Sequence, residues 1–159
     1  MADLLDHIDG LAAAFTFAAR KDLDEGSKAA SADGSRLTPD WRTRIPERLA
    51  GLAAVWQAAG AWTGATRAGG IDMPAEVAGN VAINEVVVHG WDIAAATGQE
   101  YTAEPEIVEA ALKFVQPTAA QSPDGIPGLF GPPVPVPDDA PLLARLLGLT
   151  GRDPDWKQP

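Results

Sequence analysis

The chain has 159 residues, 46% of them hydrophobic, and a formal net charge of −10. Its length and apolar content predict one globular domain with a sizeable core. The negative charge argues against nucleic acid or an anionic membrane as a partner, because phosphates would be repelled. No apolar run reaches the roughly 20 residues of a membrane span. The acidic start is unlike a signal peptide, so we expect a cytoplasmic protein.

The first part of the chain predicts two helices separated by a loop. Residues 2–21 place apolar side chains at the spacing of one buried helix face, namely Leu4, Ile8, Leu11, Phe15 and Ala18. Residues 22–40 are rich in Gly, Ser, Asp and Ala, which is typical of a loop. A second helix is expected over residues 45–59, with Pro46 in its first turn. Residues 62–72 predict a glycine-containing connection.

A third helix is expected over residues 74–97. Pro74 suits its first turn, and Gly98 suits its C-terminal cap. The β-branched run at residues 86–88 is also compatible with a strand. The periodic segment is too long for a strand, however, and alanines flank it on both sides, which favours the helix. A fourth helix is expected over residues 105–115.

The end of the chain has a different character. Prolines are dense over residues 128–137, which predicts an extended segment. Asp138 or Asp139 is expected to cap a short last helix, with Pro141 in its first turn. The sequence therefore predicts an all-α helical bundle in a single domain, 1–159. Its bundle helices cover about 1–115, and the extended tail with a short helix covers about 116–159.

The third predicted helix contains a candidate metal site. Glu85 and His89 fall one turn apart on the same face, with Asp92 a further turn on. A carboxylate and an imidazole in an apolar run need compensation, which a divalent metal would provide. A site with three protein ligands draws them from at least two elements, and His7 is the only other histidine. Spacing alone leaves open an ordinary Glu85–His89 polar pair and a boundary position for His7.

The neighbouring residues have weaker interpretations. Asp92 would either orient His89 as a hydrogen-bond acceptor or be a solvated helix residue. A basic cluster, Arg42, Arg44 and Arg48, is better explained as a solvated helix face than as a binding site for an anionic substrate. The absence of cysteine excludes thiolate ligands and a cysteine nucleophile.

The block at residues 78–98 contains the sequence Asn-Glu-Val-Val-Val-His-Gly-Trp-Asp. Together with residues 40–46, 66–70 and the tail from 128 to 154, it resembles a known family. This family comprises actinobacterial metal-binding proteins related to the N-terminal domain of mycothiol-dependent maleylpyruvate isomerase, in the DinB-like superfamily. The resemblance implies an up-down four-helix bundle and a divalent metal, expected to be zinc, held by His7, Glu85 and His89. It also implies mycothiol, a low-molecular-weight thiol, as a partner.

The chain departs from the family pattern at both ends. Relatives usually begin with a further helix ahead of the segment that contains His7, and the full isomerase has an additional C-terminal domain. A bundle without its first helix is expected to expose the apolar face of residues 4–15 and a flank of the third helix. A large exposed apolar patch usually means association, so we expect a homo-oligomer, most simply a dimer.

Three hypotheses for the function follow. The first is an isomerase or S-transferase in which the metal activates a thiol for attack on a small electrophile. The second is a non-catalytic module that binds a metal or a small molecule on the same scaffold. The third is a structural or oligomeric protein in which Glu85 and His89 form an ordinary polar pair. Metal analysis separates the third from the others, and a thiol-dependent assay separates the first two.

Overall fold

The computed structural model describes residues 1–27, 30–126 and 129–158. The chain forms two compact units, Met1–Ala82 and Ile83–Pro159, which we call the N-terminal and C-terminal units. The helices and strands of the described residues are α1 (Ala2–Arg20), α2 (Trp41–Val55), β1 (Ala65–Ala68), β2 (Ile71–Pro74), α3 (Ala75–Ala96), α4 (Pro105–Gln121) and α5 (Leu142–Leu149). Short 3-10 helices lie at Glu25–Ser27, Gly34–Arg36 and Ala59–Trp62. Helix α3 begins in the N-terminal unit and ends in the C-terminal unit.

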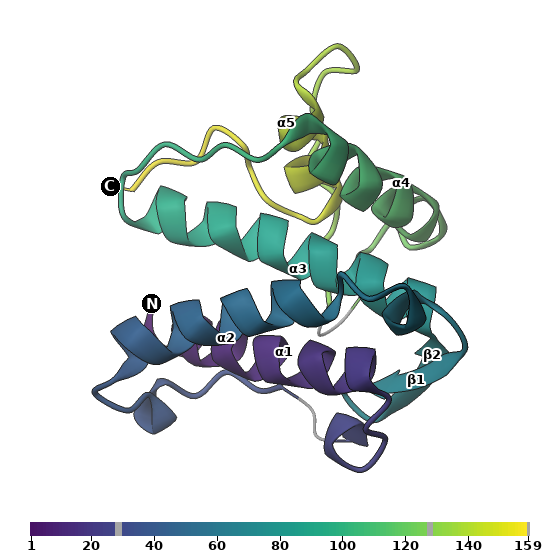
Figure 1. Cartoon of the computed structure of the whole chain (residues 1–159). Helices are drawn as coiled ribbons and strands as arrows, with labels where there is room; N and C mark the ends of the chain where they lie inside the picture. Colours follow the sequence, from purple (N-terminus) through teal and green to yellow (C-terminus); the bar gives the residue numbers. More distant parts are fainter. Residues whose placement is uncertain (28–29, 127–128, 159) are drawn as a thin grey trace. The chain divides into compact units, whose positions relative to one another are not determined.

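The core of the N-terminal unit is formed where α1 and α2 lie side by side (Figure 1). Phe15 of α1 packs in one buried cluster with Leu52 and Trp56, at the end of α2. The indole Nε1 of Trp56 donates a hydrogen bond to the Phe15 carbonyl at 3.1 Å, which satisfies its polar atom within the core. Of the predicted apolar stripe of α1, Ile8, Phe15 and Ala18 are therefore buried, and Leu4 and Leu11 are partly buried. Ile8 and Phe15 are 8% and 5% exposed, so the expected uncovering of this face is wrong.

Helix α2 begins at Trp41, earlier than the predicted start at residue 45. Pro46 therefore lies inside the helix instead of in its first turn. The early start is stabilised by Arg44, whose guanidinium contacts the Asp40 carboxylate one turn earlier at 2.9 Å. Arg42 lies over the Trp41 ring, 4.1 Å from its centroid.

Asp9 of α1 is buried at 7% exposure and faces two arginines of α2. Arg44 Nη2 lies 3.1 Å from Asp9 Oδ2, and Arg48 Nη1 lies 3.0 Å from Asp9 Oδ1. Two members of the predicted basic cluster thus neutralise a buried carboxylate between α1 and α2. They are neither a purely solvated face nor an open site for an anionic substrate.

The connection predicted at residues 62–72 contains a β-hairpin, so the all-α prediction is wrong here. Strands β1 and β2 pair antiparallel with Ala68 opposite Ile71, which leaves Gly69 and Gly70 as the turn. Both glycines have positive φ, 58° and 82°. A two-residue turn of this kind matches the twist of a hairpin and favours glycine at both positions. The fold is therefore mostly helical with a small two-stranded sheet.

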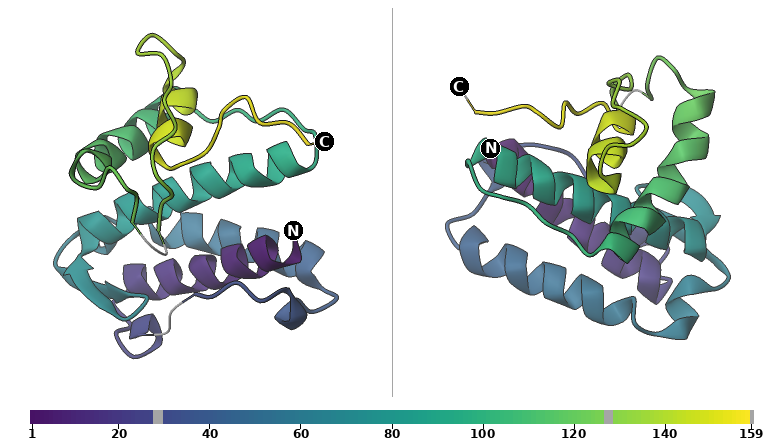
Figure 2. Two further views of the ribbon diagram at one scale, coloured as in Figure 1. Left: turned by 180° about the vertical axis from the view of Figure 1, so that it is seen from behind. Right: turned by 90° about the horizontal axis from the view of Figure 1, so that it is seen from above.

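The core of the C-terminal unit lies between the second part of α3 and helices α4 and α5. Val87 and Val88 are 3% and 2% exposed, whereas Val86 is 46% exposed. The β-branched run is thus helical, and it buries two of its three members. They pack in a cluster with the buried residues Val108, Ala111, Leu112, Val115, Ala119, Phe130 and Leu146. Helices α4 and α5 lie against each other (Figure 2).

Two contacts position the ends of these helices. Gly98 has φ 67° two residues after the end of α3, as predicted for its C-terminal cap. Tyr101 returns from there to lie against Gly90, where an added Cβ would come within 2.7 Å of the tyrosine Oη. Helix α4 continues to Gln121 with Pro117 inside it, past the predicted end at residue 115.

The proline-rich segment packs on its own unit. Of the predicted extended residues, Gly128 lies outside the described residues, and 131–137 contain no helix or strand. The Val134 amide donates to the Gly148 carbonyl of α5 at 2.9 Å. A Cβ on Gly148 would lie 2.5 Å from Val136 Cγ2. The glycine therefore allows the extended segment to approach the helix closely.

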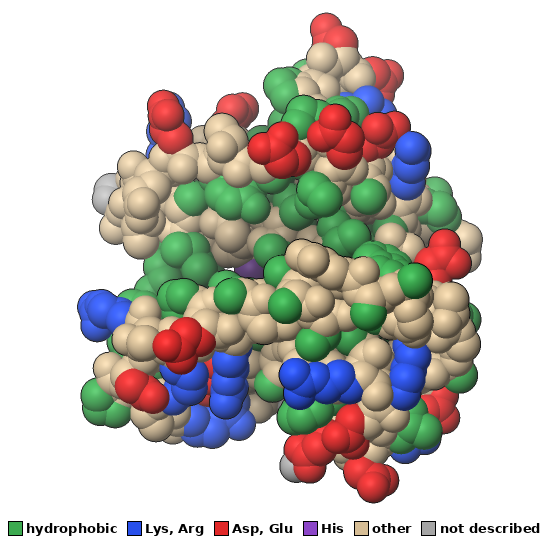
Figure 3. Space-filling view, viewed as in Figure 1, with side chains coloured by type: hydrophobic (Ala, Val, Ile, Leu, Met, Phe, Trp, Pro, Cys, Tyr) green, Lys and Arg blue, Asp and Glu red, His purple; other side chains and the backbone are tan. Residues whose placement is uncertain are grey.

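Charged side chains are distributed unevenly. On the face drawn in Figure 3, most Lys and Arg side chains lie over the N-terminal unit. Ion pairs with carboxylates are made within the N-terminal unit by Arg36, Arg44, Arg48 and Arg67. Among the described residues, no helix has both the length and the apolar content that crossing a membrane requires.

Candidate metal centre

Helix α3 presents Glu85, His89 and Asp92 from successive turns, as the sequence spacing predicts. The helix is fixed locally by Val87 and Val88, which are buried on another face. The three polar side chains are only partly accessible, with exposed fractions of 13%, 12% and 20% in that order. The sequence thus places two carboxylates and one imidazole in a largely desolvated row.

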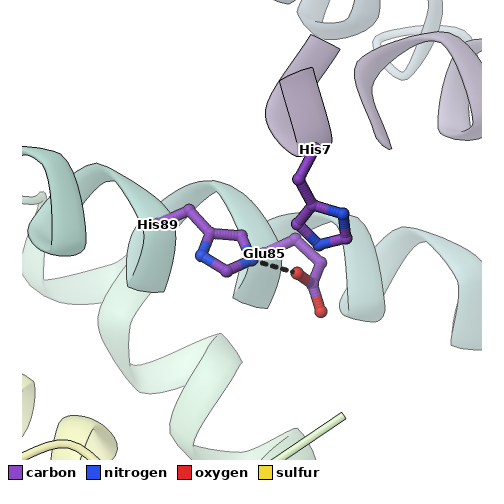
Figure 4. A group of neighbouring side chains, drawn as sticks. All are labelled: His7, Glu85 and His89. Atoms are coloured by element: carbon purple, nitrogen blue, oxygen red, sulfur yellow. Dashed lines mark ion pairs between the residues drawn. The ribbon is translucent and has the colours of Figure 1, made fainter. Parts of the chain in front are cut away.

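The imidazole of His89 contacts both carboxylates. Its Nε2 lies 2.9 Å from Glu85 Oε2, the ion pair drawn in Figure 4. Its Nδ1 lies 2.8 Å from Asp92 Oδ2. Asp92 is therefore a hydrogen-bond partner of His89. A carboxylate at Nδ1 fixes the ring orientation and directs Nε2 towards Glu85.

These contacts determine the protonation of His89. Burial by itself would lower the pKa of the imidazole, but the hydrogen bonds and charges of Asp92 and Glu85 outweigh burial. Together they raise the pKa of His89 from 6.5 to about 9. At neutral pH and without a metal, the ring is thus a cation between two carboxylates. A divalent cation that takes its Nε2 must first displace that proton.

Asp92 also contacts Arg152, which lies near the end of the chain in the same unit. Arg152 Nη2 donates to Asp92 Oδ2 at 2.9 Å, and Arg152 Nε lies 3.3 Å from Oδ1. Arg152 Nη1 donates to the Thr150 carbonyl at 2.8 Å. Burial would raise the pKa of Asp92, but the bonds from His89 and Arg152 lower it. Sequence reasoning missed Arg152 as part of this row, because 60 residues separate it from Asp92.

A cavity of about 320 Å³ opens beside Asp92 and Arg152. Trp91 and Trp156 contribute aromatic side chains to its lining, and Asp153 adds a carboxylate. Trp91 is partly exposed. The cavity has the mixed aromatic and polar lining that small-molecule sites use.

His7, the third predicted ligand, lies on α1 in the N-terminal unit and is partly buried. His89 offers a nitrogen and Glu85 an oxygen as metal ligands. The imidazole of His7 would add a second nitrogen. Two imidazoles and one carboxylate form a donor set that zinc and related divalent metals accept. The chemistry of the three residues therefore fits the metal that the resemblance implies.

Comparison with known protein families gives a match over the first part of the chain. The family described as the mycothiol maleylpyruvate isomerase N-terminal domain matches residues 1–94. This range contains His7, Glu85, His89 and Asp92 but ends before Arg152. No curated protein and no solved structure matches the chain.

Proposed function

Because the chain belongs to the family of the mycothiol maleylpyruvate isomerase N-terminal domain, we propose that it binds a divalent metal and uses it to activate a low-molecular-weight thiol. The reaction would be of the isomerase or S-transferase type, with a small electrophile as substrate. The observation that carries the proposal is the row on α3, where His89 Nε2 and Glu85 Oε2 face each other at 2.9 Å. A proton lies between these two atoms in the metal-free protein, and a metal bound to both of them would replace that proton.

We propose His7, Glu85 and His89 as the ligands. The donor types support this grouping, since imidazole nitrogens and carboxylate oxygens are ligands that a divalent metal accepts. The family match supports it independently, because residues 1–94 contain all three. Zinc is the metal we expect from two imidazoles and one carboxylate.

The surrounding residues have defined tasks in this proposal. Asp92 holds the Nδ1 proton of His89 and so leaves Nε2 as the donor atom. A bound divalent metal would supply the positive charge that favours the thiolate form of a thiol at neutral pH. The cavity next to Asp92 is large enough to hold part of a small molecule against Trp91 and Trp156.

The thiol must come from outside the protein, because the chain contains no cysteine. Mycothiol is the thiol that the family description names, and maleylpyruvate is the corresponding first electrophile to test. A reduced thiol requires a reducing compartment, for which the cytoplasm is our proposed location.

The test is elemental analysis of protein purified without chelator, followed by a thiol-dependent turnover assay. We expect close to one metal per chain, and turnover that requires both the metal and the thiol. The matched control is Glu109→Gln, which changes an exposed carboxylate of α4 but neither a proposed ligand nor a residue of the cavity. Metal without turnover for any thiol and electrophile would favour the non-catalytic binding module. Absence of bound metal, also after incubation with zinc, would reject the proposal.

We also propose that the chain associates as a homodimer, through α3 rather than through the apolar face of α1. The apolar face of α1 is largely buried, and on α3 the support comes from Val77 and Val86, which are 37% and 46% exposed. Exposed valines on one helix are modest support. Light scattering at low micromolar concentration tests the proposal, and a monodisperse monomer would reject it.

A further inference from the structure

Arg152 closes a chain of contacts that begins at the proposed ligand His89. Asp92 Oδ2 lies 2.8 Å from His89 Nδ1 and 2.9 Å from Arg152 Nη2, so one oxygen serves both partners. The other oxygen, Oδ1, faces Arg152 Nε at 3.3 Å. A carboxylate with both oxygens engaged by one planar guanidinium has little freedom to rotate.

The guanidinium is itself anchored. Its Nη1 donates to the carbonyl of Thr150, the residue that follows α5. Thr150 is buried at 1% exposure, and its hydroxyl bonds back to the last turn of α5. The side chain of Arg152 is only 21% exposed. Arg152 thus ties Asp92 to the buried end of α5, so the position of Asp92 depends on more than helix α3.

We propose that Arg152 is a positioning residue for the metal centre, which acts on His89 through Asp92. This inference rests on the proposed function, since the orientation of His89 matters for binding only if Nε2 is a ligand. Without Arg152, Asp92 can turn towards solvent and release Nδ1. The imidazole then loses the constraint that directs Nε2 to Glu85. Residues that orient a ligand in this way typically account for about a 10–100-fold change in metal affinity.

Arg152→Gln is the variant that tests this role, because it removes the charge and the paired donors while keeping much of the side-chain length. We expect zinc affinity, measured by competition with a chromophoric chelator, to fall about tenfold. Arg152→Lys retains the charge without the planar fork and should recover only part of the loss. Arg145→Gln, an arginine change on α5, should leave the affinity unchanged.

A double-mutant cycle shows whether Arg152 acts through Asp92. In the Asp92→Asn background, Arg152→Gln should cause little further loss of zinc affinity, because the path to His89 is already interrupted. Equal losses in both backgrounds would overturn the proposal. An unchanged or higher affinity in the Arg152→Gln single variant would also overturn it. In that case any fall in thermal stability would show a purely structural role.

Crystal structures of the metal-free protein and of Arg152→Gln separate this inference from the proposed function. We expect Asp92 to leave His89 Nδ1 in the variant. If wild type binds no metal, the proposed function fails and the inference about metal affinity fails with it. The crystal comparison still decides whether Arg152 positions Asp92 against His89, and an unmoved Asp92 would refute that.

Discussion

Each unit of the molecule contains a sequestered aspartate that is held by side chains from another part of the chain. Asp9 in the N-terminal unit contacts Arg44 and Arg48. Asp92 in the C-terminal unit contacts His89 and Arg152. The first network contains only cations that keep their charge at any ordinary pH. The second contains an imidazole, which can give up its proton.

This difference separates a structural network from a candidate site. The Asp9 network has one stable state, in which a buried carboxylate is neutralised between α1 and α2. The row of Glu85, His89 and Asp92 has two states, one with a proton on His89 Nε2 and one in which a divalent cation replaces that proton. A buried charge cluster is thus informative about function when one of its members can exchange what it binds.

The largest effect is expected from His89→Ala. We expect metal retention to be abolished, with an affinity loss beyond the roughly hundredfold that outer residues reach. Helix α3 should remain folded, because alanine has the higher helix propensity. Metal content by elemental analysis and helicity by circular dichroism test both parts. Equal metal content in matched preparations of wild type and variant would show that His89 is no ligand.

Asp9→Ala should have the next largest effect, and on stability rather than on metal. It leaves Arg44 and Arg48 facing a buried position without a carboxylate. We expect a loss of about 3 kcal/mol in the free energy of unfolding, near the lower end for broken buried pairs because the arginines are partly exposed. Urea denaturation measures the change, with Asp40→Asn as the control for an exposed partner of Arg44. A comparable loss in that control would contradict the importance of burial.

The pH dependence of stability should distinguish the two networks. In the metal-free protein the folded pKa of His89 is about 9, above its ordinary 6.5. The stabilisation from its charged form is therefore fully present below pH 6.5 and is lost as the pH rises through about 9. The shift corresponds to roughly 3 kcal/mol. Urea denaturation with chelator, for wild type and His89→Gln, should give a difference that shrinks across this window. A constant difference would contradict the assigned pKa.

The smallest effect is expected at the hairpin. Arg67 Nε contacts Asp72 Oδ1 at 2.7 Å across the two strands, but the Asp72 side chain is 70% exposed. Water and salt screen such a pair. Asp72→Asn should therefore leave the Tm unchanged within error in a thermal melt. A clear fall in Tm would mean that geometry matters more than burial in these ion pairs.

Helices were predictable where apolar periodicity and burial agree. The spacing of Ile8 and Phe15 predicted α1, and Gly98 predicted the end of α3. The hairpin was not recognised, although Gly69-Gly70 between short alternating segments is a known turn signal. Helix α4 extends past its predicted end, with Pro117 inside it and Ala119 buried on the core side.

The candidate site was predictable only as far as local spacing reaches. Glu85, His89 and Asp92 belong to one helix, so their shared face follows from its geometry. Arg152 follows α5, and its contact with Asp92 depends on how the chain returns to α3. The spacing of apolar residues along the sequence does not predict such a long-range contact. The charge of Asp9 was likewise unassigned, because its partners lie on another helix.

The close approach of Tyr101 to Gly90 has a consequence for large-scale mutational maps of this protein. Position 90 adjoins the proposed ligand His89, yet even a methyl group there would meet the tyrosine ring. Every substitution at this position is expected to score as deleterious for reasons of space. A map that ranks positions by sensitivity would therefore mark Gly90 as a functional residue. Pairing each substitution with Tyr101→Ala would restore tolerance at Gly90 and reveal the steric origin of the signal.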